Sequence, residues 1–109
     1  MASFKRSYLA FAILALLHQQ ERYGYELIQI IEGRIKGPQV KQGVLYPLRK
    51  SLEQRGLIEH TWRSGDNTPD RKYWSLTQQG TVFLAQERRA IRDFVAFLTP
   101  FLGEEKESH

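Results

Sequence analysis

The chain has 109 residues, which is enough for one folded domain and too few for two. It contains no cysteine, so a disulfide framework and thiol chemistry are excluded, and we expect a cytoplasmic protein. The formal charge is +4, and the segment from residue 34 to residue 72 alone carries +5, with nine Lys and Arg against four acidic residues. Such a basic patch is typical of a protein that binds a polyanion, with a solvated surface as the alternative.

The first predicted helix is apolar from residue 8 to residue 17. This run of about ten residues is too short to cross a bilayer and leads into polar residues instead of a small-residue cleavage site, so we expect neither a membrane span nor a signal peptide. Its apolar positions form two stripes, one with Leu9, Ile13, Leu16 and Leu17 and the other with Phe4, Tyr8, Phe11 and Ala15. One stripe can pack within its own domain. The second needs a further partner, either the last helix of the same chain or a second subunit.

The next two helices are expected to form a helix-turn-helix. The earlier one covers about residues 24–35, with an inner face of Leu27, Ile28, Ile31 and Ile35. The later one ends at Gly56, and its apolar positions are Leu45, Leu48 and Leu52. Pro47 is unusual inside a helix, but a start near Gly43 places it within about one turn of the N-terminus, where its missing N–H costs less. This later helix is the candidate recognition helix, which enters the major groove by its N-terminal end.

A change of period after this helix predicts two strands. Residues 57–63 and 71–76 are rich in Ile, Trp, Tyr and Thr, and residues 64–70 between them are dense in turn formers, so we expect a hairpin with a flexible loop. Both tryptophans, Trp62 and Trp74, alternate with apolar residues on one strand face and are therefore expected in the core. A basic helix that leads into a basic-edged hairpin is the layout of a winged helix.

The last predicted helix begins after Thr77, whose hydroxyl suits an N-cap. Positions at steps of four and three from Leu84 form a stripe that is apolar except at Arg88, and phenylalanines widen it. The stripe is Leu84, Arg88, Ile91, Val95, Leu98 and Leu102, with Phe94, Phe97 and Phe101 beside it. A helix of roughly 25 residues is about 37 Å long, more than the small winged domain can cover, so its far half is expected to pack on a second copy in an isologous dimer. Pro100 is expected to bend or end the helix before Phe101.

These elements together predict a mainly α fold with a small β-hairpin. We expect a winged helix-turn-helix that has an N-terminal helix and a long C-terminal dimerisation helix. The expected division is a DNA-binding domain over residues 1–76, the dimerisation helix over residues 77–103 and a polar tail over residues 104–109.

One set of residues is spread over nearly the whole chain: Gly43-Val44-Leu45-Tyr46-Pro47-Leu48, Gly56-Leu57-Ile58, Trp62, Arg71-Lys72-Tyr73-Trp74-Ser75-Leu76-Thr77 and Gly80. Together these residues resemble the PadR family of bacterial transcriptional regulators, and the resemblance covers roughly residues 8–102. It implies two winged heads joined through their terminal helices. Lys41 and Val44 depart from the family pattern, in which small hydroxyl residues are common at these positions, so the DNA contacts are expected to differ in detail.

Eight residues are candidates for DNA contact: Lys41, Gln42, Tyr46, Arg49, Lys50, Arg63, Arg71 and Lys72. Gln42 stands where a recognition helix reads base edges, with a solvated side chain as the alternative. The resemblance implies that Tyr46 presents its hydroxyl to the DNA backbone, and the alternative is a packing residue whose hydroxyl alone is in water. The basic residues of the hairpin either meet phosphates and the minor groove or guard an edge strand.

A second set of candidates is apolar and comes from the two terminal helices: Phe4, Tyr8, Phe11, Ile91, Phe94, Phe97, Leu98 and Phe101. These residues are expected to form the dimer seam. The same aromatic surface is also a candidate pocket for a flat hydrophobic effector, with dimer core alone as the alternative.

The sequence contains no recognisable catalytic motif. The three histidines are scattered, and there is no paired-histidine metal motif, no Gly-rich phosphate loop and no nucleophile elbow. We therefore expect no enzyme, no metal and no cofactor. The predicted function is a sequence-specific DNA-binding regulator, a homodimeric repressor on a near-palindromic promoter site. The rival hypothesis is a small-molecule-sensing or protein-interaction module with a winged-helix fold.

Overall fold

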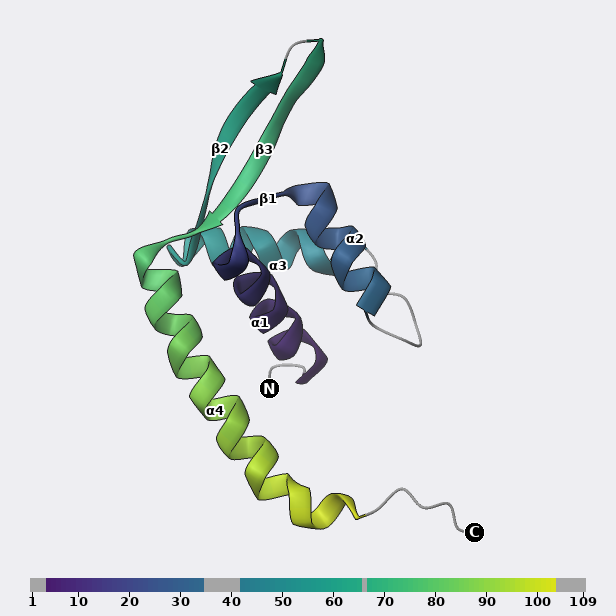
Figure 1. The fold of residues 1–109 in the computed structure, drawn as a ribbon, viewed down its shortest axis with the longest axis vertical. Helices are drawn as coiled ribbons and strands as arrows, with labels where there is room; N and C mark the ends of the chain where they lie inside the picture. The colour runs from purple at the N-terminus through teal and green to yellow at the C-terminus, as the bar shows by residue number, and fades with distance from the viewer. Residues whose placement is uncertain (1–3, 35–41, 66, 104–109) are drawn as a thin grey trace.

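The structure is a computed structural model that describes residues 4–34, 42–65 and 67–103. In chain order its elements are α1 (Phe4–Gln19), β1 (Arg22–Tyr23), α2 (Gly24–Arg34), α3 (Gln42–Gln54), β2 (Ile58–Gly65), β3 (Thr68–Leu76) and α4 (Gln78–Leu102). Figure 1 shows α1, α2 and α3 grouped at the base of a projecting hairpin, while α4 extends in the opposite direction. This arrangement confirms the predicted winged helix-turn-helix with a long C-terminal helix.

The helix-turn-helix elements follow the predicted pattern. Helix α2 begins at Gly24 as expected, and its predicted end at Ile35 lies outside the described residues. Helix α3 ends in a Schellman turn, because Gly56 takes a φ of 77°, its amide donates to the Glu53 carbonyl and the Leu57 amide donates to the Leu52 carbonyl at 3.0 Å. The left-handed conformation at this point favours glycine. The turn leads α3 directly into β2.

The sheet has three antiparallel strands in the order β1-β3-β2. The sequence analysis missed β1, which is only two residues long and therefore shows no periodicity. It pairs with β3 through Arg22 opposite Trp74 and Tyr23 opposite Tyr73. This short strand fixes the start of α2 against the hairpin near its base.

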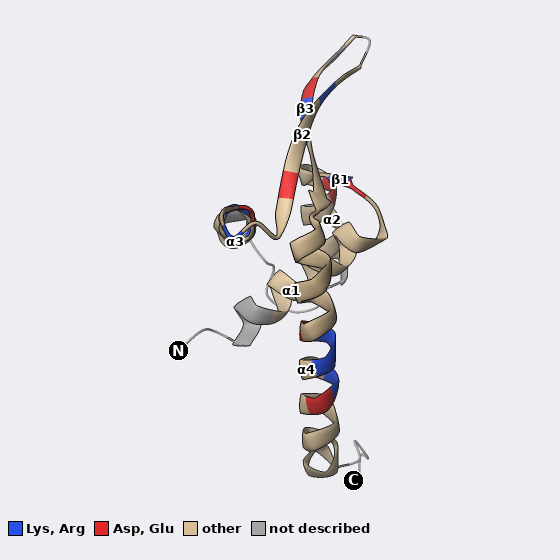
Figure 2. Ribbon diagram, turned by 90° about the vertical axis from the view of Figure 1, so that its left-hand side faces the viewer, with Lys and Arg blue, Asp and Glu red and all other residues tan. Residues whose placement is uncertain are grey.

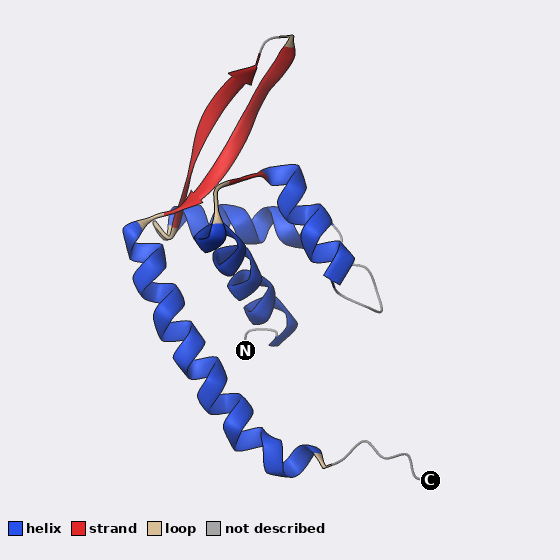
Figure 3. Cartoon of the chain, in the orientation of Figure 1, coloured by secondary structure: helices blue, strands red, loops and turns tan. Residues whose placement is uncertain are grey.

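The hairpin is longer than predicted, and the expected loop over residues 64–70 is wrong. Gly65 pairs with Thr68, so the strands continue almost to the tip. Asn67 takes a φ of 62°, in the left-handed region that asparagine tolerates. The turn-forming residues thus lie at the ends of paired strands, and the hairpin projects beyond the helices (Figure 3).

The core draws apolar side chains from every helix and from the sheet: Leu9, Ile13, Leu14, Leu17, Leu27, Ile31, Leu45, Leu48, Leu52, Leu57, Ile58, Trp74 and Leu84. Helix α1 runs through its centre and contacts α2, α3, α4 and β3. Its first predicted stripe is mostly buried. In the second stripe Phe11 and Ala15 are half-buried and Tyr8 is exposed, while the side chain of Phe4 lies outside what the structure describes. Helix α4 of the same chain therefore covers only part of α1.

The two tryptophans differ, and the prediction that both lie in the core is wrong for Trp62. Trp74 is 3% exposed, whereas Trp62 is 61% exposed. The pairing of His60 with Trp74 and of Trp62 with Lys72 does place both rings on one face of the sheet. Helices cover that face only near its base, so alternation along a strand gave the correct face but not the burial.

Helix α4 begins as predicted. The Thr77 hydroxyl oxygen accepts a hydrogen bond from the Gly80 amide at 2.9 Å, and the hydroxyl donates to the Gly56 carbonyl at 2.7 Å. The prediction for Pro100 is met only as a bend: the helix continues to Leu102, and its last turns deviate from the main axis in Figure 1. No helix within the described part of the chain is long and apolar enough to cross a membrane.

We expect Gly80→Ala to lower the free energy of unfolding by about 1–3 kcal/mol, the usual cost of overpacking. A Cβ at Gly80 would lie 2.0 Å from the Leu57 carbonyl oxygen, a backbone atom that cannot rotate away. Gly33→Ala is the matched control, since nothing lies within 4 Å of its Cβ position, and it is expected to be neutral or slightly stabilising. Urea unfolding at one fixed protein concentration measures both. Equal stability of the two variants would contradict the close contact between α4 and the start of β2.

Candidate nucleic-acid interface

Helix α3 divides its side chains between the core and solvent. Leu45, Leu48 and Leu52 are buried against the other elements, and Tyr46 and Lys50 are exposed, Tyr46 by 58%. Figure 2 shows Lys and Arg on α3, along the hairpin and in a band on α4. The outer side of α3 is therefore a polar, basic and aromatic surface next to the hairpin.

Arg49 also belongs to α3, but its side chain is half-buried. The guanidinium carbon lies 4.9 Å from the centre of the Trp74 ring and 5.3 Å from the centre of the Tyr46 ring. Burial lowers the pKa of Arg49, against the opposing influence of Tyr46 and Glu53. An arginine pKa is high enough that the group stays charged at neutral pH. Arg49 therefore places a desolvated positive charge between two aromatic rings.

Lys72 on β3 extends this packing. Its ammonium nitrogen lies 5.4 Å from the centre of the Trp74 ring and 5.6 Å from that of Trp62. Aromatic and cationic groups thus alternate from the hairpin to the recognition helix in one cation–aromatic stack: Trp62, Lys72, Trp74, Arg49 and Tyr46. Contacts of this kind contribute roughly 0.5–2 kcal/mol each, more where they are desolvated. The stack joins the wing to α3.

A hydrogen bond makes a second link between the same two elements. His60 Nδ1 on β2 lies 2.5 Å from Glu53 Oε2 on α3, and the His60 ring centre is 5.0 Å from that of Trp74. The sequence analysis saw His60 only as one of three scattered histidines. Its partner lies seven residues earlier on a different element, so no periodic signal joins the two.

The opposite face of the hairpin carries the other two candidate arginines. Arg71 lies 4.7 Å from the centre of the Tyr23 ring, and Arg63 lies 4.8 Å from that of Tyr73. Arg63 also forms an ion pair with Glu21. Each side of the wing therefore presents cations packed on aromatic rings, with the charge of Arg63 partly neutralised.

The structure brings some candidates together and separates others. Tyr46, Arg49, Lys50 and Lys72 line two adjoining hollows between α3 and β3, whereas Arg63 and Arg71 lie across the sheet. Lys41 and the side chain of Gln42 lie outside the described residues.

The sequence analysis did not predict part of the lining of the first hollow. It is also lined by Tyr23, Gly24 and Tyr25, the residues that join β1 to α2. The aromatic-Gly-aromatic sequence at the start of the predicted helix was the available signal. Among the described residues, no group of three or more His, Asp and Glu side chains is placed to hold a metal ion.

Several candidate seam residues of the terminal helices are exposed in the single chain. Phe97 and Phe101 are 65% and 74% exposed, and their ring centres are 5.6 Å apart. Phe94 and Tyr8 are also exposed, while Phe11, Ile91 and Leu98 are half-buried. A hollow of about 260 Å³ beside α1 is lined by Tyr8, Ala12, Leu16 and Ile31 among others. A single chain thus leaves much aromatic surface in contact with solvent.

Comparison with known sequences identifies one family. The profile described as "Transcriptional regulator PadR-like family" matches residues 13–86. An uncharacterized protein of Lysinibacillus sphaericus is 33% identical over 82 residues, which cover 74% of this chain and 75% of that protein. The transcriptional regulator YqjI of Escherichia coli is 32% identical over 89 residues, 81% of this chain, but the matched region spans only 41% of YqjI.

Comparison with solved structures agrees over nearly the full chain. A PadR-like transcriptional regulator from Bacillus cereus superimposes with a TM-score of 0.82 at 28% identity, covering 94% of this chain and 100% of that one. A PadR family transcription regulator from Clostridium difficile gives a TM-score of 0.78 at 28% identity, covering 88% of this chain and 99% of that one.

The packing of Arg49 predicts that Arg49→Ala lowers the free energy of unfolding by about 1–2 kcal/mol, since it removes two cation–aromatic contacts and a half-buried aliphatic stem. Lys50→Ala on the same helix is the control, and as an exposed substitution it is expected to stay within about 0.5 kcal/mol. Urea unfolding at fixed concentration measures both variants. An Arg49 variant as stable as the Lys50 variant would mean that the stack does not hold α3 to the wing.

Proposed function

The chain belongs to the PadR-like family of transcriptional regulators, and from this premise we propose that it is a homodimeric repressor that occupies a near-palindromic promoter site. The family agrees with the resemblance seen in the sequence, and it is a family of regulators, not of enzymes. The observation that carries the proposal is the basic and aromatic surface formed by α3 and the adjoining hairpin.

The proposed DNA contacts come from two elements. Helix α3 enters the major groove by its N-terminal end, with Gln42 toward the bases and with Lys41, Tyr46 and Lys50 toward the backbone. The cations of the hairpin, Arg63, Arg71 and Lys72, meet flanking phosphates or the minor groove. Arg49 contributes charge from its position between the rings. Support comes from the exposure of Tyr46 and Lys50 on the outer side of α3.

The proposed dimer forms through the terminal helices. Residues 1–76 act as the DNA-binding head and residues 77–103 as the dimerisation helix, with residues 104–109 as a polar tail. The exposed phenylalanines of α4 support this, because a second copy in an isologous contact would bury them. Two heads related by a two-fold axis match a near-palindromic site, and such a protein works in the cytoplasm, where bacterial DNA lies.

An effector site is a secondary proposal. The hollow beside α1 is lined mainly by apolar side chains and adjoins Tyr8 of the seam. A flat hydrophobic molecule seated there would change DNA affinity only if it favoured one arrangement of the two heads over the other. The rival function is a sensing or protein-interaction module without a DNA role. It does not explain why the exposed surface of α3 is basic.

We expect DNA binding to weaken steeply with salt. If about four phosphate contacts form per subunit, the slope of log K against log salt concentration for a dimer is on the order of −7. Charge reversal in Lys50→Glu should weaken binding to all sequences alike, because a phosphate contact carries no base information. Arg89→Glu, the same charge change on α4, is the control and should have a much smaller effect. Fluorescence anisotropy with upstream and unrelated duplexes measures this, and a slope near zero would remove the DNA-binding proposal.

We expect Phe97→Asp to separate the dimer. Phe97 is 65% exposed in one chain, so the substitution leaves the core of the head intact, but in the dimer it buries an unpaired charge. Gln86→Asp, at an exposed position earlier in α4, is the control and should remain dimeric. Sedimentation velocity with circular dichroism follows assembly and folding together. A well-folded monomer for the unmodified chain at micromolar concentration would refute the seam.

A further inference from the structure

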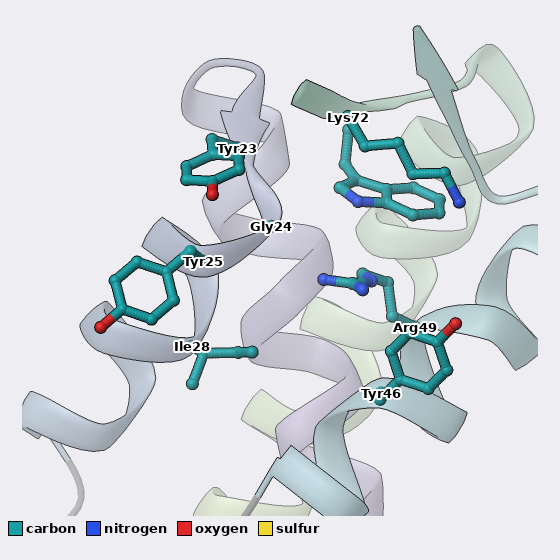
Figure 4. A pocket seen from close by; sticks show the side chains of 8 residues that line it. Tyr23, Gly24, Tyr25, Ile28, Tyr46, Arg49 and Lys72 are labelled. Atoms are coloured by element: carbon teal, nitrogen blue, oxygen red, sulfur yellow. The ribbon is translucent and has the colours of Figure 1, made fainter. Parts of the chain in front are cut away.

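One hollow lies at the meeting point of three elements, the first turn of α2, the outer side of α3 and the middle of β3. Its volume is about 260 Å³, and its lining includes Tyr23, Gly24, Tyr25, Arg49, Lys72 and Trp74. In Figure 4 Arg49 reaches from α3 toward Gly24, with Tyr23 and Tyr25 on the far side and Lys72 above. Two cations and several aromatic rings thus surround one small space.

Trp74 brings an unsatisfied donor to this space. The residue is 3% exposed, and its indole Nε1 is buried without a hydrogen-bond partner in the described part of the chain. Buried polar groups are nearly always paired, and an unpaired one costs about 1–3 kcal/mol. The indole nitrogen can only donate. A partner for this nitrogen must therefore be an acceptor.

A second donor points at the same place. A Cβ built on Gly24 would lie 3.4 Å from Trp74 Nε1 and 2.5 Å from Arg49 Nη1, so both nitrogens converge beside the first residue of α2. The indole and guanidinium nitrogens are both donors and cannot bond to each other, whereas one oxygen atom between them could accept a hydrogen bond from each. The start of α2 adds the partial positive charge of a helix N-terminus.

The charges around the hollow favour an anion. Lys72 and Arg49 are positive, and Glu26, the acidic residue of the first turn of α2, is directed toward the Tyr23 amide at 2.9 Å. Glu53 beside the adjoining hollow is engaged with His60. The charged and indole groups that line the hollow only donate, and its tyrosine hydroxyls can donate as well as accept, which suits a phosphate better than a base edge with its mixed donors and acceptors.

We propose that this hollow seats one phosphate of the DNA backbone, with a non-bridging oxygen that accepts from Trp74 Nε1 and Arg49 Nη1. The inference rests on the proposed DNA-binding function and deepens it. In the free protein the Arg49 tip and Gly24 cover the indole nitrogen, so the phosphate oxygen enters with a small rotation of the guanidinium that leaves it packed on the Trp74 ring. Trp74 thereby becomes a DNA-binding residue, and Gly24 is required because a side chain at this position would fill the hollow.

The test uses the indole N–H as its own reporter. The chain has two tryptophans, so Trp62→Phe leaves a single indole, that of Trp74. In ¹⁵N-resolved NMR this indole resonance should move downfield as a short duplex is added. Separate titrations use a duplex from upstream of the gene, an unrelated duplex and inorganic phosphate, because a backbone contact responds to both duplexes.

Binding measurements separate the hydrogen bond from the charge. Trp74→Phe should weaken binding about tenfold for every duplex, as expected for one charge-assisted hydrogen bond, and leave the salt slope unchanged because no charge is lost. Arg49→Ala should also reduce the magnitude of the slope by about 1 per subunit. In Gly24→Ala the added Cβ meets only the flexible Arg49 tip and the indole. This variant therefore tests whether the hollow must stay open for DNA binding, without a loss of core volume.

The outcomes distinguish the two levels of the proposal. A protein that binds DNA while its Trp74 indole resonance stays fixed, with Trp74→Phe and Gly24→Ala binding as tightly as the unmodified chain, overturns the phosphate seat and leaves the proposed function standing. A resonance that moves with inorganic phosphate but not with DNA makes the hollow a free-anion site and overturns the backbone assignment. Absence of binding to any duplex overturns both.

Discussion

The packing of the Arg49 guanidinium against the ring of Trp74 joins the recognition helix to the wing. Helix α3 and strand β3 are joined along the chain only through the Schellman turn and the whole of β2. Without a lateral contact the hairpin is free to tilt against the helix. The stack and the bond from His60 to Glu53 supply that contact on one side of the sheet. A protein that binds DNA with a helix and a wing needs a fixed distance between them, because the spacing of the phosphates on the duplex is fixed.

Much of the fold could be predicted because its signals are local. Apolar spacing located the inner face of α3, and Gly56 and Thr77 marked the turn and the cap that bound the wing. What failed depended on contacts between distant segments. Strand β1 has two residues and exists only because β3 lies beside it. Trp62 and Trp74 have the same alternation, and the helices that cover one of them are distant in sequence.

The candidate site follows the same division. Charge density identified α3 and the hairpin as the basic region, because composition needs no contacts. The sequence did not reveal that Arg49 is half-buried between Trp74 and Tyr46, that Arg63 pairs with Glu21, or that Gly24 lies beside the indole nitrogen. The contacts of Arg49 with Trp74, of Arg63 with Glu21 and of Gly24 with the indole nitrogen each join segments that are distant in the sequence. A list of basic residues therefore finds the surface but not the difference between a solvated cation and one held in place.

The joint between the head and α4 has a geometric consequence. Thr77 donates its hydroxyl to Gly56 and its amide to Leu57, and Gly80 lies against the Leu57 carbonyl, so α4 leaves the head in a direction fixed by the turn that ends the recognition helix. A helix of 25 residues is about 37 Å long, so a rotation of about 5° at this joint displaces its far end by about 3 Å. In a two-fold assembly that displacement is doubled between the heads. A substitution at Gly56, Thr77 or Gly80 would therefore change the direction of α4 without changing the exposed side chains of α3.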